Sequence, residues 1–223
     1  MKNVRIWFEK KGAARYISHL DLTRNMARGL KLSGLPVWYT EGFNPRIYMT
    51  YAMPLSLGVC GERECMDIRL TEDVPLEDIA PRLNAHLPAG LQALEATEPV
   101  DKFEDIQYGA YQLFLEGDPA ALEEQLHTLF QREEVLVLKH TKKGDKEFDI
   151  KPDFQNAQLH PQEDGLLLEL RLPCSVNGST NPALLQEALK RHLGLEPYGA
   201  ITRKCLLLQD FSPLRAKSQE KFA

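Results

Sequence analysis

The sequence predicts an α+β protein made of two tandem units, because one order of elements occurs twice along its 223 residues. The order is strand, helix, strand, strand, helix, strand, which in a ferredoxin-like unit gives an antiparallel sheet with two helices on one face. A polar, acidic stretch at 97–107 separates the repeats and is typical of a linker. We therefore expect ferredoxin-like domains at 1–99 and 108–210, each with a free sheet face, and a charged tail at 211–223 that is frayed over 215–223.

The first repeat is predicted from hydrophobic periodicity and helix-capping signals. Apolar residues alternate with polar ones over 4–10, as expected of a strand with one buried face. Ser18 and Asp21 form a capping-box-like pair that places a helix start near His19, and Gly34 ends this helix. The other elements of this repeat are expected as strands at 36–40, 64–70 and 91–97 and a helix at 76–87.

The second repeat shows the same order of elements. Leucines spaced by three and four residues predict a helix around 122–129, and a second helix is expected at 181–193. Strands are expected at 111–117, 135–140, 165–172 and 200–208. The intervals 41–63 and 142–164 both fall between the second and third strands of their repeats, so we expect them at equivalent ends of the two sheets.

Charge is distributed unevenly along the chain. The formal net charge is -5, yet residues 1–50 hold nine Lys or Arg and three acids, which leaves 18 bases and 29 acids for 51–223. A basic end on an acidic body indicates a localised anion-binding face and excludes a general polyanion-binding protein.

No catalytic residue, metal site or cofactor motif is predicted. The four cysteines include no C-x-x-C pair, and the six histidines lack the H-x-H and H-x-x-x-H spacings of metal ligands. The C-x4-C spacing of Cys60 and Cys65 is commoner for buried thiols in strands than for a metal half-site. The chain start lacks the apolar core of a signal peptide, and no apolar run approaches the roughly 20 residues of a membrane helix. We therefore expect a cytoplasmic protein with reduced thiols and no membrane contact.

Three cations of the first predicted helix have the spacing of a single helix face. Arg24, Arg28 and Lys31 recur at i, i+4 and i+7. Such a row would suit phosphates, although a solvated helix face has the same spacing and is the commoner explanation. His19 at the helix start is able to carry protons near neutrality, but it has no recognisable catalytic partner, so a structural or anion-contacting role is favoured.

The segment after this helix combines a turn with aromatic residues. Gly42, Phe43, Asn44 and Pro45 predict the turn, because Gly and Asn adopt positive φ and Pro fixes the exit. Phe43 followed by Arg46 places a ring beside a cation, as in sites for single-stranded nucleic acid. An aromatic hairpin packed on its own sheet explains the pattern equally well.

A second basic cluster, which includes Lys142, Lys143 and Lys146, falls at the start of the 142–164 interval, inside the acidic second half. A solvated hairpin tip has this composition too. However, this interval is equivalent to the one in the first repeat that carries Phe43 and Arg46, which favours one cleft lined by both. The predicted RNA-binding residues are Arg24, Arg28, Lys31, Phe43, Arg46, Lys142, Lys143 and Lys146.

Several motifs resemble a bacterial family of unknown function whose members are called radical SAM-linked proteins. They are SHLDLTRNMARGL, GFNP, PLSLG and ECMDIRL, with KKGDKEFDIKP further on. Members of that family are fused to the C-terminal end of radical S-adenosylmethionine proteins or encoded beside them. Of the residues predicted to bind RNA, the resemblance carries over Arg24, Arg28, Phe43 and Lys143. It also carries over Ser18, His19, Leu20, Asp21, Gly42, Pro45, Pro54, Gly58, Glu64, Asp67, Gly144, Asp149 and Arg203.

The resemblance implies a non-catalytic partner of a radical SAM enzyme. The C-x3-C-x2-C of such an enzyme's iron–sulfur cluster is absent from this sequence. Tandem ferredoxin-like domains are similar in plan to CRISPR repeat-processing endonucleases and tRNA pseudouridine synthases, but the glycine-rich loop of the former and the Arg-Thr-Asp segment of the latter are missing. We expect an RNA-binding accessory protein for tRNA or rRNA modification; the alternatives are a module that docks on the enzyme without RNA contact and an RNA-processing enzyme.

Overall fold

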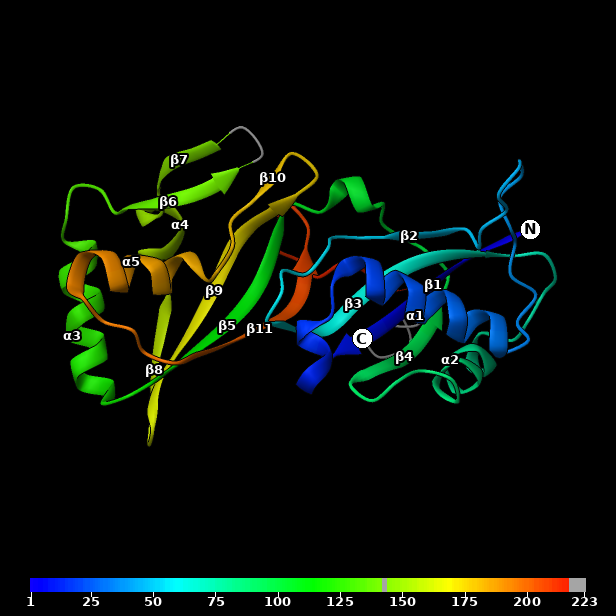
Figure 1. Cartoon of the computed structure of the whole chain (residues 1–223), viewed down its shortest axis with the longest axis horizontal. Helices are drawn as coiled ribbons and strands as arrows, with labels where there is room; N and C mark the ends of the chain where they lie inside the picture. The colour runs from blue at the N-terminus through cyan, green and yellow to red at the C-terminus, as the bar shows by residue number, and fades with distance from the viewer. Residues whose placement is uncertain (142–143, 217–223) are drawn as a thin grey trace. The chain divides into compact units, whose positions relative to one another are not determined.

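The computed structural model describes residues 1–141 and 144–216 and has a mixed α+β fold (Figure 1). Its strands pair mostly antiparallel, and five α-helices occur in the described residues, so the predicted α+β class is confirmed. The chain forms two compact units. Unit 2 comprises Tyr108–Lys204, and unit 1 comprises Met1–Gln107 together with the segment that begins at Cys205.

The sheet of unit 1 is built around its first strand. It contains β1 (Lys2–Lys10), β2 (Met49–Tyr51), β3 (Val59–Leu70) and β4 (Leu91–Thr97). The order is β4–β1–β3–β2, and each neighbouring pair is antiparallel. Ile6 lies opposite Met66 on one side and Ala96 on the other, and this register aligns the buried residues of the three long strands.

Two helices cover one face of this sheet, α1 (His19–Leu32) and α2 (Leu76–Asn84). Both contribute to the hydrophobic core that also contains Ile6 and Phe8 of β1. Gly29 permits the close approach of α2, because a Cβ there would lie 2.9 Å from Leu83 Cδ1. The predicted helix start is correct: the Ser18 side chain accepts a hydrogen bond from the Asp21 N–H at 3.1 Å.

The expectation of a free second face is wrong for unit 1. Arg5 and Trp7 project from β1 to the side opposite the helices, and both are buried. The ring centroid of Phe103, in a short 3-10 turn (Phe103–Asp105), lies 4.3 Å from the Arg5 guanidinium carbon. The stretch expected to be a linker therefore packs on the sheet.

The expected strand at 36–40 is also wrong. Only isolated bridges occur there, between Val37 and Leu70 and between Tyr39 and Ile47, because the chain leaves the sheet to form a projecting hairpin. The strand that follows α1 and pairs with β3 is instead β2, which lies inside the interval expected to be an insertion.

Unit 2 also contains sheet strands, which pair mostly antiparallel. Its strands are β5 (Tyr108–Glu116), β8 (Gln158–Gln162), β9 (Gly165–Ser175), β10 (Gly178–Ser179) and β11 (Gly199–Leu207), the last of which runs on into unit 1. The order is β10–β9–β5–β11, and β8 pairs with β9. The helices are α3 (Pro119–Phe130), α4 (Lys151–Phe154) and α5 (Leu184–Leu193), and α3 packs against α5 and β9.

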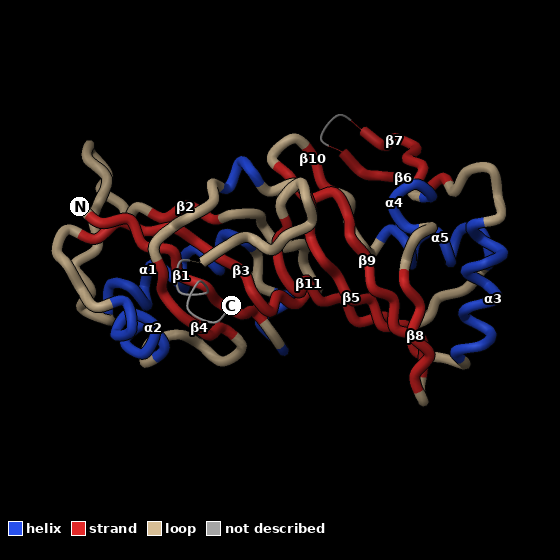
Figure 2. Tube along the Cα trace, turned by 180° about the vertical axis from the view of Figure 1, so that it is seen from behind, coloured by secondary structure: helices blue, strands red, loops and turns tan. Residues whose placement is uncertain are grey.

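The strand expected at 135–140 exists but does not join this sheet. It is β6 (Leu136–Thr141), which among the described strands pairs only with β7 (Gly144–Asp149), as a separate two-stranded ribbon (Figure 2). The expected insertion at 142–164 instead supplies β8, which takes the place beside β9. Both segments have strand-like sequences, and their local pattern does not specify which strand each one joins.

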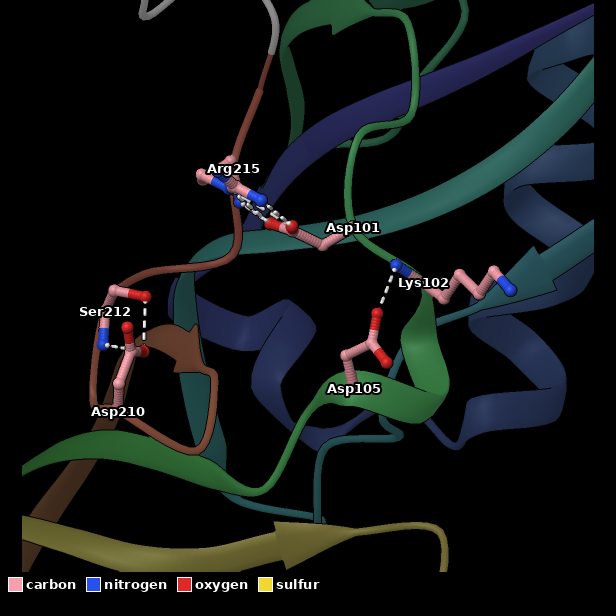
Figure 3. A network of polar contacts seen from close by, with 6 residues as sticks. All are labelled: Asp101, Lys102, Asp105, Asp210, Ser212 and Arg215. Atoms are coloured by element: carbon pink, nitrogen blue, oxygen red, sulfur yellow. Dashed lines mark hydrogen bonds and ion pairs between the residues drawn. The ribbon is translucent and has the colours of Figure 1, made fainter.

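The tail expected to fray from Arg215 onward is held in unit 1 at its first two residues. Arg215 binds the Asp101 carboxylate through its backbone N–H at 2.8 Å and its Nη2 at 2.7 Å (Figure 3). Ala216 is buried and forms a bridge with Pro99. Residues 217–223 lie outside the described residues.

Replacing Arg215 with Ala should lower the free energy of unfolding of unit 1 by about 1–3 kcal/mol at pH 7, as expected for hydrogen bonds to a charged group. The hydrogen bond from Arg215 is the main cause that lowers the pKa of Asp101. A lowered carboxyl pKa stabilises the fold above the unfolded value of about 3.9 and ceases to do so as the pH falls through the folded value. The difference between parent and variant should therefore shrink below about pH 4.

Urea unfolding followed by tryptophan fluorescence measures this in unit 1 alone, because the two tryptophans of the chain, Trp7 and Trp38, both belong to it. Lys31→Ala, which removes an exposed cation from α1, is the control and should change stability by less than about 0.5 kcal/mol. If the Arg215→Ala variant were as stable as the parent at pH 7, the Arg215–Asp101 pair would not stabilise unit 1.

Candidate functional site

Helix α1 carries the three predicted cations on its solvent face. Arg24, Arg28 and Lys31 are exposed, whereas Met26 and Leu30 on the other side are fully buried. Arg24 Nη1 lies 3.2 Å from an Asp21 carboxylate oxygen, but the Arg24 side chain remains 69% exposed. A surface pair of this kind contributes little and leaves the guanidinium available to an anion.

The residues after α1 form a projecting hairpin at 36–48, which we call the aromatic hairpin. The Thr40 N–H donates to the Arg46 carbonyl at 2.8 Å, and the Tyr48 N–H donates to the Trp38 carbonyl at 3.1 Å. At its tip Phe43 has a relative exposure of 107%, so no neighbouring residue covers the ring. Phe43 is therefore not packed on its own sheet. Arg46 is also exposed at this tip.

The base of the aromatic hairpin is held on β3 by three side chains in contact, Trp38, Tyr48 and Arg69, which we call the Trp38–Tyr48–Arg69 stack. The two rings have centroids 5.7 Å apart and are tilted by 57° to each other. The Arg69 guanidinium carbon lies 4.2 Å from the Tyr48 centroid and 5.3 Å from that of Trp38. The Trp38 N–H also donates to the Arg69 carbonyl at 2.8 Å, so the backbone and the side chains fix the same point.

Sequence reasoning did not identify this stack. A signal was present, because Trp38 and Tyr48 are equally distant in sequence from Phe43 at the centre of the predicted turn. Equal distance from a turn makes two residues candidates for a cross-strand pair. The third member, Arg69, is on a different strand and had no local signal.

His19 lies at the first turn of α1 against Tyr51. Their ring centroids are 4.9 Å apart in an edge-to-face arrangement. Partial burial, and then the charge of Lys10, lower the pKa of His19 from its ordinary value, which keeps the ring neutral near pH 7. The Lys10 ammonium is itself buried and donates to the Ile17 carbonyl at 3.2 Å.

The two acidic motif residues of β3 are involved in packing. Asp67 accepts two hydrogen bonds from Arg5, from Nε at 2.7 Å and from Nη2 at 2.9 Å. Glu64 is buried and covers Gly61, where a Cβ would lie 2.6 Å from Glu64 Cγ. Both residues therefore contribute to the packing of unit 1.

The motif glycines Gly42 and Gly144 have positive φ, and the turn proline is exposed. Gly42 has φ of 119° and Gly144 has φ of 111°, a region that favours glycine. Pro45 is exposed beside Phe43 in the aromatic hairpin.

In unit 2, Lys146 is exposed on β7, and Lys142 and Lys143 lie outside the described residues. An Asp149 carboxylate oxygen accepts hydrogen bonds from the Val135 N–H at 2.8 Å and the Lys151 N–H at 3.0 Å, which closes the β6–β7 ribbon. The surface predicted to join unit 1 cations to this ribbon stays a prediction.

Arg203 is buried in unit 2 beside a thiol and a phenol. Its Nη1 lies 3.5 Å from Cys174 Sγ. Burial raises the pKa of Tyr111, and the Arg203 charge opposes this shift. The structure therefore places this motif residue in the core of unit 2.

Two surface cavities lie away from the predicted site residues, and no metal-ligand cluster is found within the described residues. A cavity of about 340 Å³ near Gly90 and one of about 500 Å³ near Asp210 contain none of the predicted site residues. No group of three or more His, Cys, Asp or Glu side chains in 1–141 and 144–216 is arranged to hold a metal ion. None of the helices among these residues is long and apolar enough to cross a membrane.

A family model described as an uncharacterized protein conserved in bacteria (DUF2344) matches residues 3–182. The chain belongs to this family. The part of the chain that matches the family model includes α1 and the aromatic hairpin and ends before α5. A search of curated proteins finds no match. Among solved structures, an unknown protein from Galdieria sulphuraria is 13% identical over 93% of this chain and 99% of the other, with a TM-score of 0.25 that supports no argument.

Replacing Arg69 with Gln should loosen the aromatic hairpin while leaving the rest of unit 1 folded. Loss of a cation–π contact of about 1 kcal/mol corresponds to about fivefold faster exchange of amide hydrogens that open locally. Hydrogen exchange at the Thr40 and Tyr48 amides measures the effect, and the Leu22 amide in α1 should exchange as in the parent. Equal protection of the hairpin amides in both proteins would show that the stack does not hold it.

Proposed function

We propose that this DUF2344 protein is an RNA-binding accessory protein that works with a radical SAM enzyme in tRNA or rRNA modification. The observation that supports RNA binding is the fully exposed ring of Phe43 on an anchored hairpin whose tip also exposes the cation Arg46. Aromatic rings and cations together are the combination that binds unpaired nucleic acid. The cationic face of α1, in the same unit, adds groups suited to phosphates.

The radical SAM part of the proposal rests on the motif resemblance. The cysteines of this chain do not have the spacing of a radical SAM cluster motif, so the radical chemistry is assigned to the partner. In this proposal the DUF2344 protein binds the RNA, and the partner performs the reaction.

We also infer that the chain contains two ferredoxin-like repeats, proposed at 1–99 and 108–210. The strand order β4–β1–β3–β2 in unit 1, with two helices on one face, supports the first repeat. In unit 2, β11–β5–β9 with β8 beside β9 supports the same order. The aromatic hairpin and the β6–β7 ribbon then occupy equivalent places, each between the first helix of a repeat and its edge strand.

A docking module without RNA contact is the second candidate, because unit 1 also exposes apolar side chains near the start of α1. Tyr16, Leu20 and Leu57 are 62%, 58% and 67% exposed. The Gly58 N–H donates to the Arg15 carbonyl at 3.0 Å, which brings Leu57 beside Tyr16. Exposed apolar groups of this kind are typical of protein-interaction sites.

Replacing Arg24 and Arg28 together by Gln should weaken RNA binding by a few kcal/mol at low salt, since two phosphate contacts are lost. The slope of log K against log salt should flatten by about one to two units. Thermal stability should stay nearly unchanged, because exposed helix charges contribute little to folding. Titration of labelled total tRNA at several salt concentrations measures both the affinity and the slope.

A matched control removes two exposed cations elsewhere, Lys102 and Lys190, by the same change to Gln. This control should retain the affinity and slope of the parent. If the parent binds no tRNA or rRNA in a salt-dependent manner, the RNA proposal fails and the docking module becomes the favoured function.

A further inference from the structure

We infer that the tip of the aromatic hairpin binds one unpaired nucleobase, so that the RNA recognised carries a loop or bulge. The inference rests on the proposed RNA binding and specifies its substrate class. Phe43 is fully exposed and is not covered by any other part of the protein.

The tip presents a single ring and little other apolar area. Both sides of Phe43 are open, and no atom lies within 4 Å of a Cβ built on the preceding Gly42. The neighbours from Glu41 to Arg46 are all exposed, and most are polar or small. A stable protein interface needs roughly 800 Å² per partner with an apolar centre, whereas stacking needs only one accessible ring face.

The ring is carried on a support that is already ordered. The hydrogen bond from Thr40 to Arg46 closes the tip, and the Arg46 N–H donates to Thr40 Oγ1 at 3.1 Å. Below it, the Trp38–Tyr48–Arg69 stack holds both arms on β3. An anchored aromatic group loses little conformational entropy when a ligand binds, which favours affinity from a single contact.

A base in a continuous duplex is not available to this ring. The faces of paired bases are stacked on each other, and the major groove of A-form RNA is too deep and narrow for side chains to read. Extruding a paired base costs a few kcal/mol, and an already unpaired base avoids most of that cost. Arg46, three residues after Phe43, is exposed in the same tip and supplies a cation for a phosphate of the same nucleotide.

Three labelled RNAs that share one stem sequence test the inference: a stem-loop, a duplex with a single-nucleotide bulge and a fully paired duplex. The parent should bind the first two at least tenfold more tightly than the third. Phe43→Ala should weaken binding of the loop and the bulge by about 5- to 150-fold, the equivalent of 1–3 kcal/mol per stacked base. It should change binding of the paired duplex by less than about twofold.

Two further replacements separate stacking from apolar contact. Phe43→Trp should retain tight binding to the loop and the bulge, because it keeps a planar ring. Phe43→Leu should lose binding as Phe43→Ala does, although it keeps an apolar side chain of similar size. All three variants should have the same melting temperature as the parent, because no residue covers the ring of Phe43.

The outcomes distinguish this inference from the proposed function. If no probe binds in a salt-dependent way, the RNA function itself fails. If all three probes bind equally, or Phe43→Ala weakens all or none of them, the RNA function stands and the unpaired-base inference is overturned. Leucine retaining the affinity of the parent would also overturn it, in favour of an apolar contact.

Discussion

The antiparallel pairing of β1 with β3 fixes the position of the other features of unit 1. With Ile6 opposite Met66, the apolar residues of both strands turn to the face covered by α1 and α2. The same register places Arg5 opposite Asp67 on the other face. Further along β3, Leu70 forms the bridge with Val37, and Arg69 lies under the aromatic hairpin. A shift of one residue would exchange the two faces and separate these partners.

Features determined by local sequence were predictable, and features determined by distant pairing were not. The start of α1 follows from Ser18 and Asp21, three residues apart, and its buried face follows from the spacing of Leu22 and Met26. The place of β8 beside β9 depends instead on competition between two segments that both have strand-like sequences. The Asp101–Arg215 pair joins residues 114 positions apart, and neither residue type specifies its partner.

Burial separates two groups of residues that the motif resemblance put together. Glu64 and Arg203 are almost completely buried, and Asp67 and Asp149 bind groups of their own units. These residues explain how the chain folds. Phe43 is open to solvent, and nothing in the described fold of unit 1 depends on its ring. Such a residue contributes little to stability, so replacing it tests the proposed RNA contact without disturbing the fold.

The insertion of unit 2 into unit 1 has a consequence for the synthesis of this protein. Domains commonly fold in order from the N-terminus as they leave the ribosome. Here Arg215 pairs with Asp101 and Ala216 with Pro99, so unit 1 lacks these contacts until the whole of unit 2 has been translated. Unit 2 is contiguous from Tyr108 to Lys204, so all of its residues are translated before the last segment of unit 1. The nascent chain therefore exposes an incomplete N-terminal unit for longer than an uninserted domain would.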